Sequence, residues 1–267
     1  MHLNQEIREG EIMRLRKALS CVLVSGLLAT IPFCVYASSE HAVPTDGTDY
    51  TQISQEVTKG NTGFSGAKEA REEDILASEN EPVKPDAPEE DGLTRASWYQ
   101  LDDMSSFVYY AQLTNYSCGP ACVRMALKYL TGTAYEESTI RTGCNTDSSG
   151  TYLADMKTYI NDQQSANTYS TKFGASKTTM KNNLYSGIVS DDAPSIIGLR
   201  ESTSAGWAFD LGAHFVATYS VKSDKSEVAI ADPWAGYVSS SSSYKWYDKS
   251  TDDVYTAYDA VDVGYMY

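Results

Sequence analysis

The stretch best suited to chemistry joins a glutamine to a cysteine six positions later. Gln112 precedes Cys118, and the cysteine opens an apolar-striped segment that predicts a helix. A thiol at a helix N-terminus lies at the positive end of the helix dipole, which favours the thiolate. An amide side chain just upstream can donate a hydrogen bond to a developing oxyanion. The pattern therefore predicts Cys118 as a nucleophile and Gln112 as an oxyanion-stabilising residue.

Only one histidine is placed to act as the base for this thiol. The chain has three: His2 precedes an apolar N-terminal run, His41 lies in a polar segment, and His214 begins a predicted strand. A Cys–His pair in the predicted domain can therefore only be Cys118 with His214. The alternative is a structural histidine at a strand start, which is the commoner role for a histidine taken alone.

A carboxylate is expected close to that histidine. Asp232 ends the strand that follows the His214 strand, and in an antiparallel hairpin these two strand ends are neighbours. A carboxylate there can accept a hydrogen bond from one imidazole nitrogen and fix the tautomer. Asp before Pro also commonly begins a turn, and the two interpretations are compatible.

Three cysteines lie beyond the N-terminal apolar run, namely Cys118, Cys122 and Cys144. Because three is odd, at least one thiol is unpaired within a monomer. Cys122 lies one helical turn after Cys118, and we interpret it as a small buried core residue. Cys144 is either a core residue or the disulfide partner of Cys122, and the sequence favours neither.

The first 37 residues are typical of an export signal. Basic residues precede an apolar run from Ala18 to Tyr36, and Val-Tyr-Ala ending at Ala37 fits the small-residue cleavage rule. We predict cleavage near Ala37 and a protein that is secreted or lies at the extracellular cell surface. An uncleaved membrane anchor is the alternative, because the run is nearly long enough to span a bilayer.

Residues 38–95 are rich in Glu, Asp, Ser, Thr, Gly and Pro and have few large apolar side chains. Such a segment cannot bury enough surface to offset the entropy of ordering, so we predict a disordered acidic linker. The alternative is a pro-segment that blocks the active-site cleft. A pro-segment usually needs apolar anchors, and only Phe64, Ile75 and Leu76 stand out.

The remaining residues, 96–267, fit one domain. A formal net charge of −15 argues against nucleic acid or an anionic membrane surface as a partner. We expect membrane contact only through the N-terminal run, and no cofactor or metal. Helical patterns cover 118–131, 151–162 and 176–186, and the capping-box pair Thr133 and Glu136 predicts a short further helix. Strand patterns cover 194–200, 214–222 and 227–232, with weaker edge strands at 244–247 and 263–267. Helices first and an antiparallel sheet second predict an α+β fold with a cleft between the layers.

Three motifs together resemble the bacteriocin-processing cysteine peptidases, and more narrowly their stand-alone secreted bacterial relatives of papain-like fold. The motifs are Gln112 with Cys-Gly-Pro-Ala-Cys, then His-Phe-Val from His214, then Asp-Pro-Trp-Ala-Gly from Asp232. The resemblance implies that Cys118 is the nucleophile, His214 the general base and acid, and Asp232 the residue that orients His214. It also implies an oxyanion hole formed by the Gln112 amide and the Cys118 backbone N–H.

One position departs from the family pattern, because Ser117 stands where the family often has Asp directly before the nucleophile. The sequence has no Walker-type glycine loop and no second long apolar run, so leader cleavage coupled to export is not expected. The resemblance implies an exported thiol hydrolase that acts on peptide or cell-wall peptide bonds. Two alternatives are a non-catalytic surface recognition or adhesin-type module and a thiol transferase that uses the same residues.

Overall fold

The computed structural model describes residues 40–53, 62–64, 66–87 and 96–267. The predicted export signal and its cleavage site lie outside these residues. Within the described ranges, no helix combines the length and apolar character needed to cross a bilayer.

A central strand of thirteen residues, β7 (Asp210–Lys222), organises the sheet. Its Phe, Val, Ala and Tyr side chains are buried along most of its length, as expected for β-branched and aromatic residues inside a sheet. β7 pairs with antiparallel neighbours on both sides and also with two short strands from the N-terminal part of the chain. The sheet order is β5 (Thr171–Lys172), β10 (Tyr265–Met266), β6 (Ile196–Glu201), β7, β8 (Glu227–Ala231) and β9 (Trp246–Ser250), with β2 (Thr62–Gly63) and β3 (Trp98–Gln100) also paired to β7.

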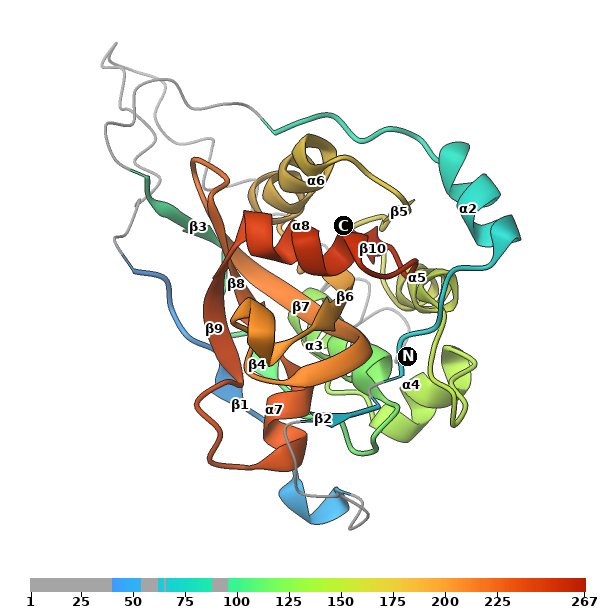
Figure 1. Ribbon diagram of the computed structural model, residues 1–267, viewed down its shortest axis with the longest axis vertical. Helices are drawn as coiled ribbons and strands as arrows, with labels where there is room; N and C mark the ends of the chain where they lie inside the picture. Colours follow the sequence, from blue (N-terminus) through green and yellow to red (C-terminus); the bar gives the residue numbers. More distant parts are fainter. Residues whose placement is uncertain (1–39, 54–61, 65, 88–95) are drawn as a thin grey trace, which may run out of the picture. The chain divides into compact units, whose positions relative to one another are not determined.

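The helices form two groups against this sheet (Figure 1). One group contains α3 (Cys118–Thr131), α4 (Glu137–Gly143) and α5 (Leu153–Gln163), and α3 packs on β7. The other contains α6 (Lys177–Val189) and α8 (Thr251–Asp259), with α8 packed on β6. The predicted α+β, papain-like arrangement of N-terminal helices on a C-terminal antiparallel sheet is therefore confirmed.

Local signals placed most elements correctly. Gly132 ends α3 in the left-handed conformation with φ 72°, and Ser176 caps α6 through its side chain. The predicted capping box does not form, because Glu136 is itself the N-cap of α4 and its side chain makes no capping bond. Among the described residues, three α-helices were not predicted, namely α2 (Glu72–Glu79), α7 (Pro233–Val238) and α8. The strand predicted near the C-terminus, β10, is not an edge strand, because it lies between β5 and β6.

The prediction of a disordered linker over 38–95 differs from the structure of the residues described there. They include β1 (Thr45–Asp46), a short 3-10 helix (Tyr50–Gln52), β2 and α2 (Glu72–Glu79), and β1 pairs with β4 (Val108–Tyr109). This region has backbone pairing and ion pairs to the domain, and its buried Ala67 and Ala87 belong to the core of the domain. The ordered region therefore begins before the predicted boundary at residue 96.

A further 3-10 turn, Thr203–Ala205, connects β6 to β7.

Candidate active site

Cys118 is the first residue of α3, and its side chain is fully buried. The helix end approaches the sheet closely because the next residue is Gly119. A Cβ atom at this position would lie 2.5 Å from the Met156 sulfur and 3.2 Å from the Phe215 ring. The glycine therefore allows the first turn of α3 to bring the Cys118 thiol against β7.

Burial controls the protonation of this thiol. It raises the pKa of Cys118 to about 12, while the backbone N–H groups of Phe215 and Gly119 lower it. The expectation of a thiolate favoured by the helix dipole does not hold in this structure, because removal of solvent disfavours the charged form more strongly than the helix end favours it.

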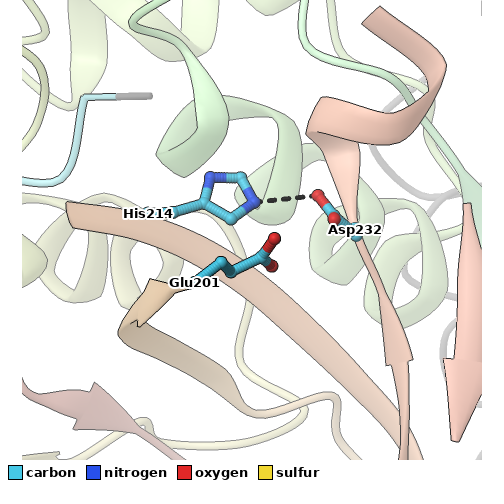
Figure 2. Close-up of side chains that lie close together, drawn as sticks. All are labelled: Glu201, His214 and Asp232. Atoms are coloured by element: carbon cyan, nitrogen blue, oxygen red, sulfur yellow. Dashed lines mark hydrogen bonds and ion pairs between the residues drawn. The ribbon is translucent and has the colours of Figure 1, made fainter. Parts of the chain in front are cut away.

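His214 and Asp232 form a buried hydrogen bond, with 2.8 Å between His214 Nε2 and Asp232 Oδ1 (Figure 2). The hairpin of β7 and β8 brings the two side chains close, because its register pairs Ala217 with Ala231, and beyond that pair Asp232 is one residue and His214 three residues along their strands. If Nε2 donates to the carboxylate, Nδ1 becomes the acceptor of the neutral ring. His214 Nδ1 is buried and has no hydrogen-bond partner among the described residues.

Asp232 has a second contact that depends on the same oxygen. Asp232 Oδ1 also accepts a hydrogen bond from the backbone N–H of Trp234 at 2.8 Å, which makes the residue the N-cap of α7. Both interpretations of this residue from the sequence, a partner of His214 and the start of a turn, are therefore visible in the structure.

Gln112 is buried beside the turn that contains Asp232, because its backbone N–H donates to the Pro233 carbonyl at 3.2 Å. Its side-chain nitrogen donates to the Thr114 carbonyl at 2.7 Å. A primary amide has two N–H groups, so this bond leaves one for another acceptor. In the described conformation, the amide is held by its own loop.

Glu201 is a buried acid of the site that the sequence analysis did not identify. One of its carboxyl oxygens lies within 4.8 Å of side-chain ligand atoms of His214 and Asp232, and the side chain points toward that pair (Figure 2). Burial and the charge of Asp232 raise the pKa of Glu201 well above its usual range. These three residues are the one group of acids, histidines and cysteines in the described chain that could hold a metal ion. Because its carboxyl lies beside this hydrogen-bonded pair, we assign Glu201 to the environment of His214. Its only sequence signal is an acid directly after a buried apolar strand.

Glu137, in α4, was also missed. It accepts hydrogen bonds from the Leu113 N–H at 3.1 and 3.3 Å, one to each carboxyl oxygen. Burial raises the pKa of Glu137 to about 7, and a hydrogen bond from the Ser117 side chain opposes that rise. Glu137 therefore holds both ends of the loop that joins Gln112 to Cys118.

The other two described cysteines are buried free thiols. Cys122 donates through its sulfur to the Phe215 carbonyl at 3.4 Å, as a core residue of α3. Since Cys144 is also unpaired, the disulfide with Cys122 that the sequence left open does not form in this structure.

A family model described as the Peptidase_C39 like family matches residues 104–263, which is more than half of the chain. The chain belongs to this family. It is therefore a cysteine-type peptidase by family, and the resemblance of the sequence to this peptidase family is confirmed, while the narrower resemblance to stand-alone secreted relatives stays a prediction. The matched region of this C39-like chain contains Gln112, Cys118, His214 and Asp232.

Two solved structures are similar to the C39-like chain at low identity. The peptidase domain of Streptococcus ComA, a bi-functional ABC transporter involved in a quorum-sensing pathway, is 16% identical, with a TM-score of 0.40, and the match covers 59% of this chain and 94% of that one. A double glycine motif protease from an AMS/PCAT transporter, solved with its leader peptide, is 14% identical, with a TM-score of 0.38, and the match covers 58% and 86%. Comparison with curated proteins gave no match.

Proposed function

We propose that this protein is an exported cysteine peptidase that hydrolyses amide bonds of peptides with Cys118, His214 and Asp232. The observation that carries the proposal is the buried hydrogen bond between His214 and Asp232. The strand that carries His214, β7, also lies against the first turn of α3. A histidine with one nitrogen bound to a carboxylate and the other unpartnered is arranged to accept a proton from a nucleophile.

The proposed reaction gives each of these residues a role. His214 Nδ1 accepts the thiol proton as the Cys118 sulfur attacks the substrate carbonyl carbon. The second N–H of the Gln112 amide and the Cys118 backbone N–H stabilise the oxyanion. The C–N bond breaks as His214 returns its proton to the leaving amine. Water, deprotonated by His214, then hydrolyses the thioester and frees the thiol.

The site of action is proposed from residues 1–37, whose pattern indicates export, so the substrate would be a peptide or a cell-wall peptide at or outside the cell surface. The net charge of −15 adds no affinity for acidic substrates.

The proposal is tested by comparing hydrolysis of a peptide library by the wild-type chain, Cys118→Ala and Cys144→Ala. Both substitutions remove a buried free thiol, but only Cys118 lies at the end of α3 beside β7. We expect Cys118→Ala to abolish hydrolysis and Cys144→Ala to retain it, with Gln112→Ala slowing the rate on the order of 10²–10³-fold. Hydrolysis at the wild-type rate by Cys118→Ala would show that the mechanism is wrong.

A further inference from the structure

A segment of the chain's own N-terminal region lies between the two layers that carry the proposed catalytic residues. The backbone of Ala67 is bonded on both sides. Its N–H donates to the Ala213 carbonyl at 3.1 Å, and its neighbours bridge to Thr151, with Gly66 O accepting from Thr151 N at 2.8 Å and Lys68 N donating to Thr151 O at 3.0 Å. Ala213 directly precedes His214 in β7. Thr151 directly precedes Tyr152, the N-cap of α5. The segment therefore bridges the sheet and the helical layer beside His214.

The same segment contacts the loop that leads to Cys118. Gly66 has φ +84°, and a Cβ atom there would lie 2.3 Å from the carbonyl oxygen of Tyr116. Real Cβ atoms essentially never approach backbone oxygen so closely, so this position takes only glycine without movement of the loop. Tyr116 is two residues before Cys118, which places the segment against both sides of the proposed site.

Both ends of the segment are fixed to the domain. Upstream, Thr62 and Gly63 form β2, which pairs in parallel with Asp210 and Leu211 at the start of β7. This is strand addition to a sheet, a common way for proteins to bind extended peptides.

Downstream, the chain passes α4 and α5 on its way to α2 (Figure 1). Lys68 forms an ion pair with Asp147 at 2.9 Å, and Arg71 forms one with Asp155 at 2.8 Å. These pairs are partly exposed, so each contributes little and is weakened by salt. These two ion pairs can therefore be broken at little cost to the stability of the domain.

The four proposed catalytic residues are buried, as expected if the segment around Ala67 covers them. Cys118, His214, Asp232 and Gln112 all have 0% exposure. Two cavities among the described residues, of about 200 and 330 Å³, are lined by other residues. Backbone bonding on both sides of Ala67 is also how an extended substrate would be held in a cleft between these layers.

We propose that residues 62–63 and 66–71 form an inhibitory strand that occupies the substrate groove of this peptidase, whose walls include the backbones of Thr151 and Ala213. The inference rests on the proposed function. The strand blocks the groove rather than entering the reaction, because the Gly66 carbonyl is bonded to Thr151 and the Gln112 side chain donates to Thr114. Release of the strand would expose the thiol and free the groove for a peptide that makes the same backbone bonds.

The test opens the groove by a single substitution in the full chain. Gly66→Ala places a Cβ against the Tyr116 carbonyl, whereas the control Gly132→Ala adds the same atom at a similar φ, +72°, where nothing lies within 4 Å. Arg71→Glu is a second opening variant that replaces the attraction to Asp155 with repulsion. Circular dichroism establishes that each variant is folded. The readouts are the rate of Cys118 alkylation by iodoacetamide, followed by mass spectrometry, and peptide hydrolysis.

We expect both opening variants to raise the alkylation rate and the hydrolysis rate on the order of tenfold, with Gly132→Ala equal to wild type. Faster alkylation of the opening variants, with no hydrolysis by any variant, would support the claim that the strand covers the Cys118 thiol. The same result would overturn the proposed peptidase function. Hydrolysis that depends on Cys118 but is equally fast in wild type and both opening variants would overturn the inhibitory strand and leave the peptidase standing. If only Arg71→Glu folds, the same comparison with wild type decides the question.

Discussion

The buried carboxyl of Glu137 is expected to make the stability of this fold decrease as pH rises. Its side chain is 1% exposed and bonds the Leu113 N–H in the loop between the proposed oxyanion residue and the nucleophile. The charged and polar groups that face it are the Ser117 hydroxyl and the guanidinium groups of Arg141 and Arg124, all of which favour the ionised form. Burial outweighs them and raises the pKa of Glu137 to about 7.

The sign and size of the effect follow from this shift. In the unfolded chain the pKa returns to about 4.5, so between these two values the folded state binds more protons than the unfolded state. The contribution of Glu137 to stability is therefore retained below about pH 4.5 and lost as pH rises through about 7. One pKa unit corresponds to about 1.4 kcal/mol, so the full loss is ~3 kcal/mol.

Urea unfolding at pH 5 and pH 8 measures this contribution directly. Glu137→Gln keeps an acceptor oxygen for Leu113 and removes the ionisation. We expect the wild type to lose about 2–3 kcal/mol more than Glu137→Gln between the two pH values. Glu136→Gln, the exposed neighbour, is the matched control and should follow the wild type. An equal pH dependence in the wild type and Glu137→Gln would refute the reasoning, because some other group would then cause it.

Two further predictions concern the site. Asp232→Asn should lower kcat by about 10³–10⁴-fold, because an amide no longer stabilises the protonated ring of His214; steady-state kinetics measures this. Since Asn also caps helices, the same variant should lose at most about 1 kcal/mol in urea unfolding, and a larger loss would assign Asp232 a mainly structural role. Gly119→Ala should destabilise the fold by about 1–3 kcal/mol and reduce hydrolysis, because the added methyl group meets side chains of α5 and β7 at 2.5 and 3.2 Å. Gly212→Ala, where nothing lies within 4 Å, is its control, and equal stability of the two variants would contradict the close packing of α3 on β7.

The meeting of His214 with Asp232 could be predicted because each step depends on local signals. A four-residue turn, Ser223–Ser226, joins two β-rich segments, and an antiparallel hairpin brings the far ends of its two strands near each other. The structure forms that hairpin, with Ala217 opposite Ala231. The extent of α3 was marked in the same way, by an apolar stripe that ends at Gly132.

The two buried acids could not be found by this reasoning, because their chemistry depends on burial by distant segments. Glu201 follows an irregularity in the β6–β7 pairing, where the register shifts after Leu199, and no local pattern in the sequence marks that shift. Glu137 lies in a short helix whose sequence suggests only capping, and its contact with Leu113 joins residues 24 apart. Residue type indicated that each could ionise, but only the fold determines where the carboxyl lies.

The ordered N-terminal segment shows why composition misled the sequence analysis there. The rule that polar segments stay disordered assumes that order is stabilised by apolar side chains of the segment itself. Around Ala67, however, the bonds use backbone C=O groups, which every residue carries, and backbone N–H groups, which only proline lacks. Their partners, at Thr151 and Ala213, become available only when the domain has folded and the groove exists. Such a segment is ordered by the groove rather than by its own sequence, so a single displaced glycine should be enough to release it, as the comparison of Gly66→Ala with Gly132→Ala is designed to measure.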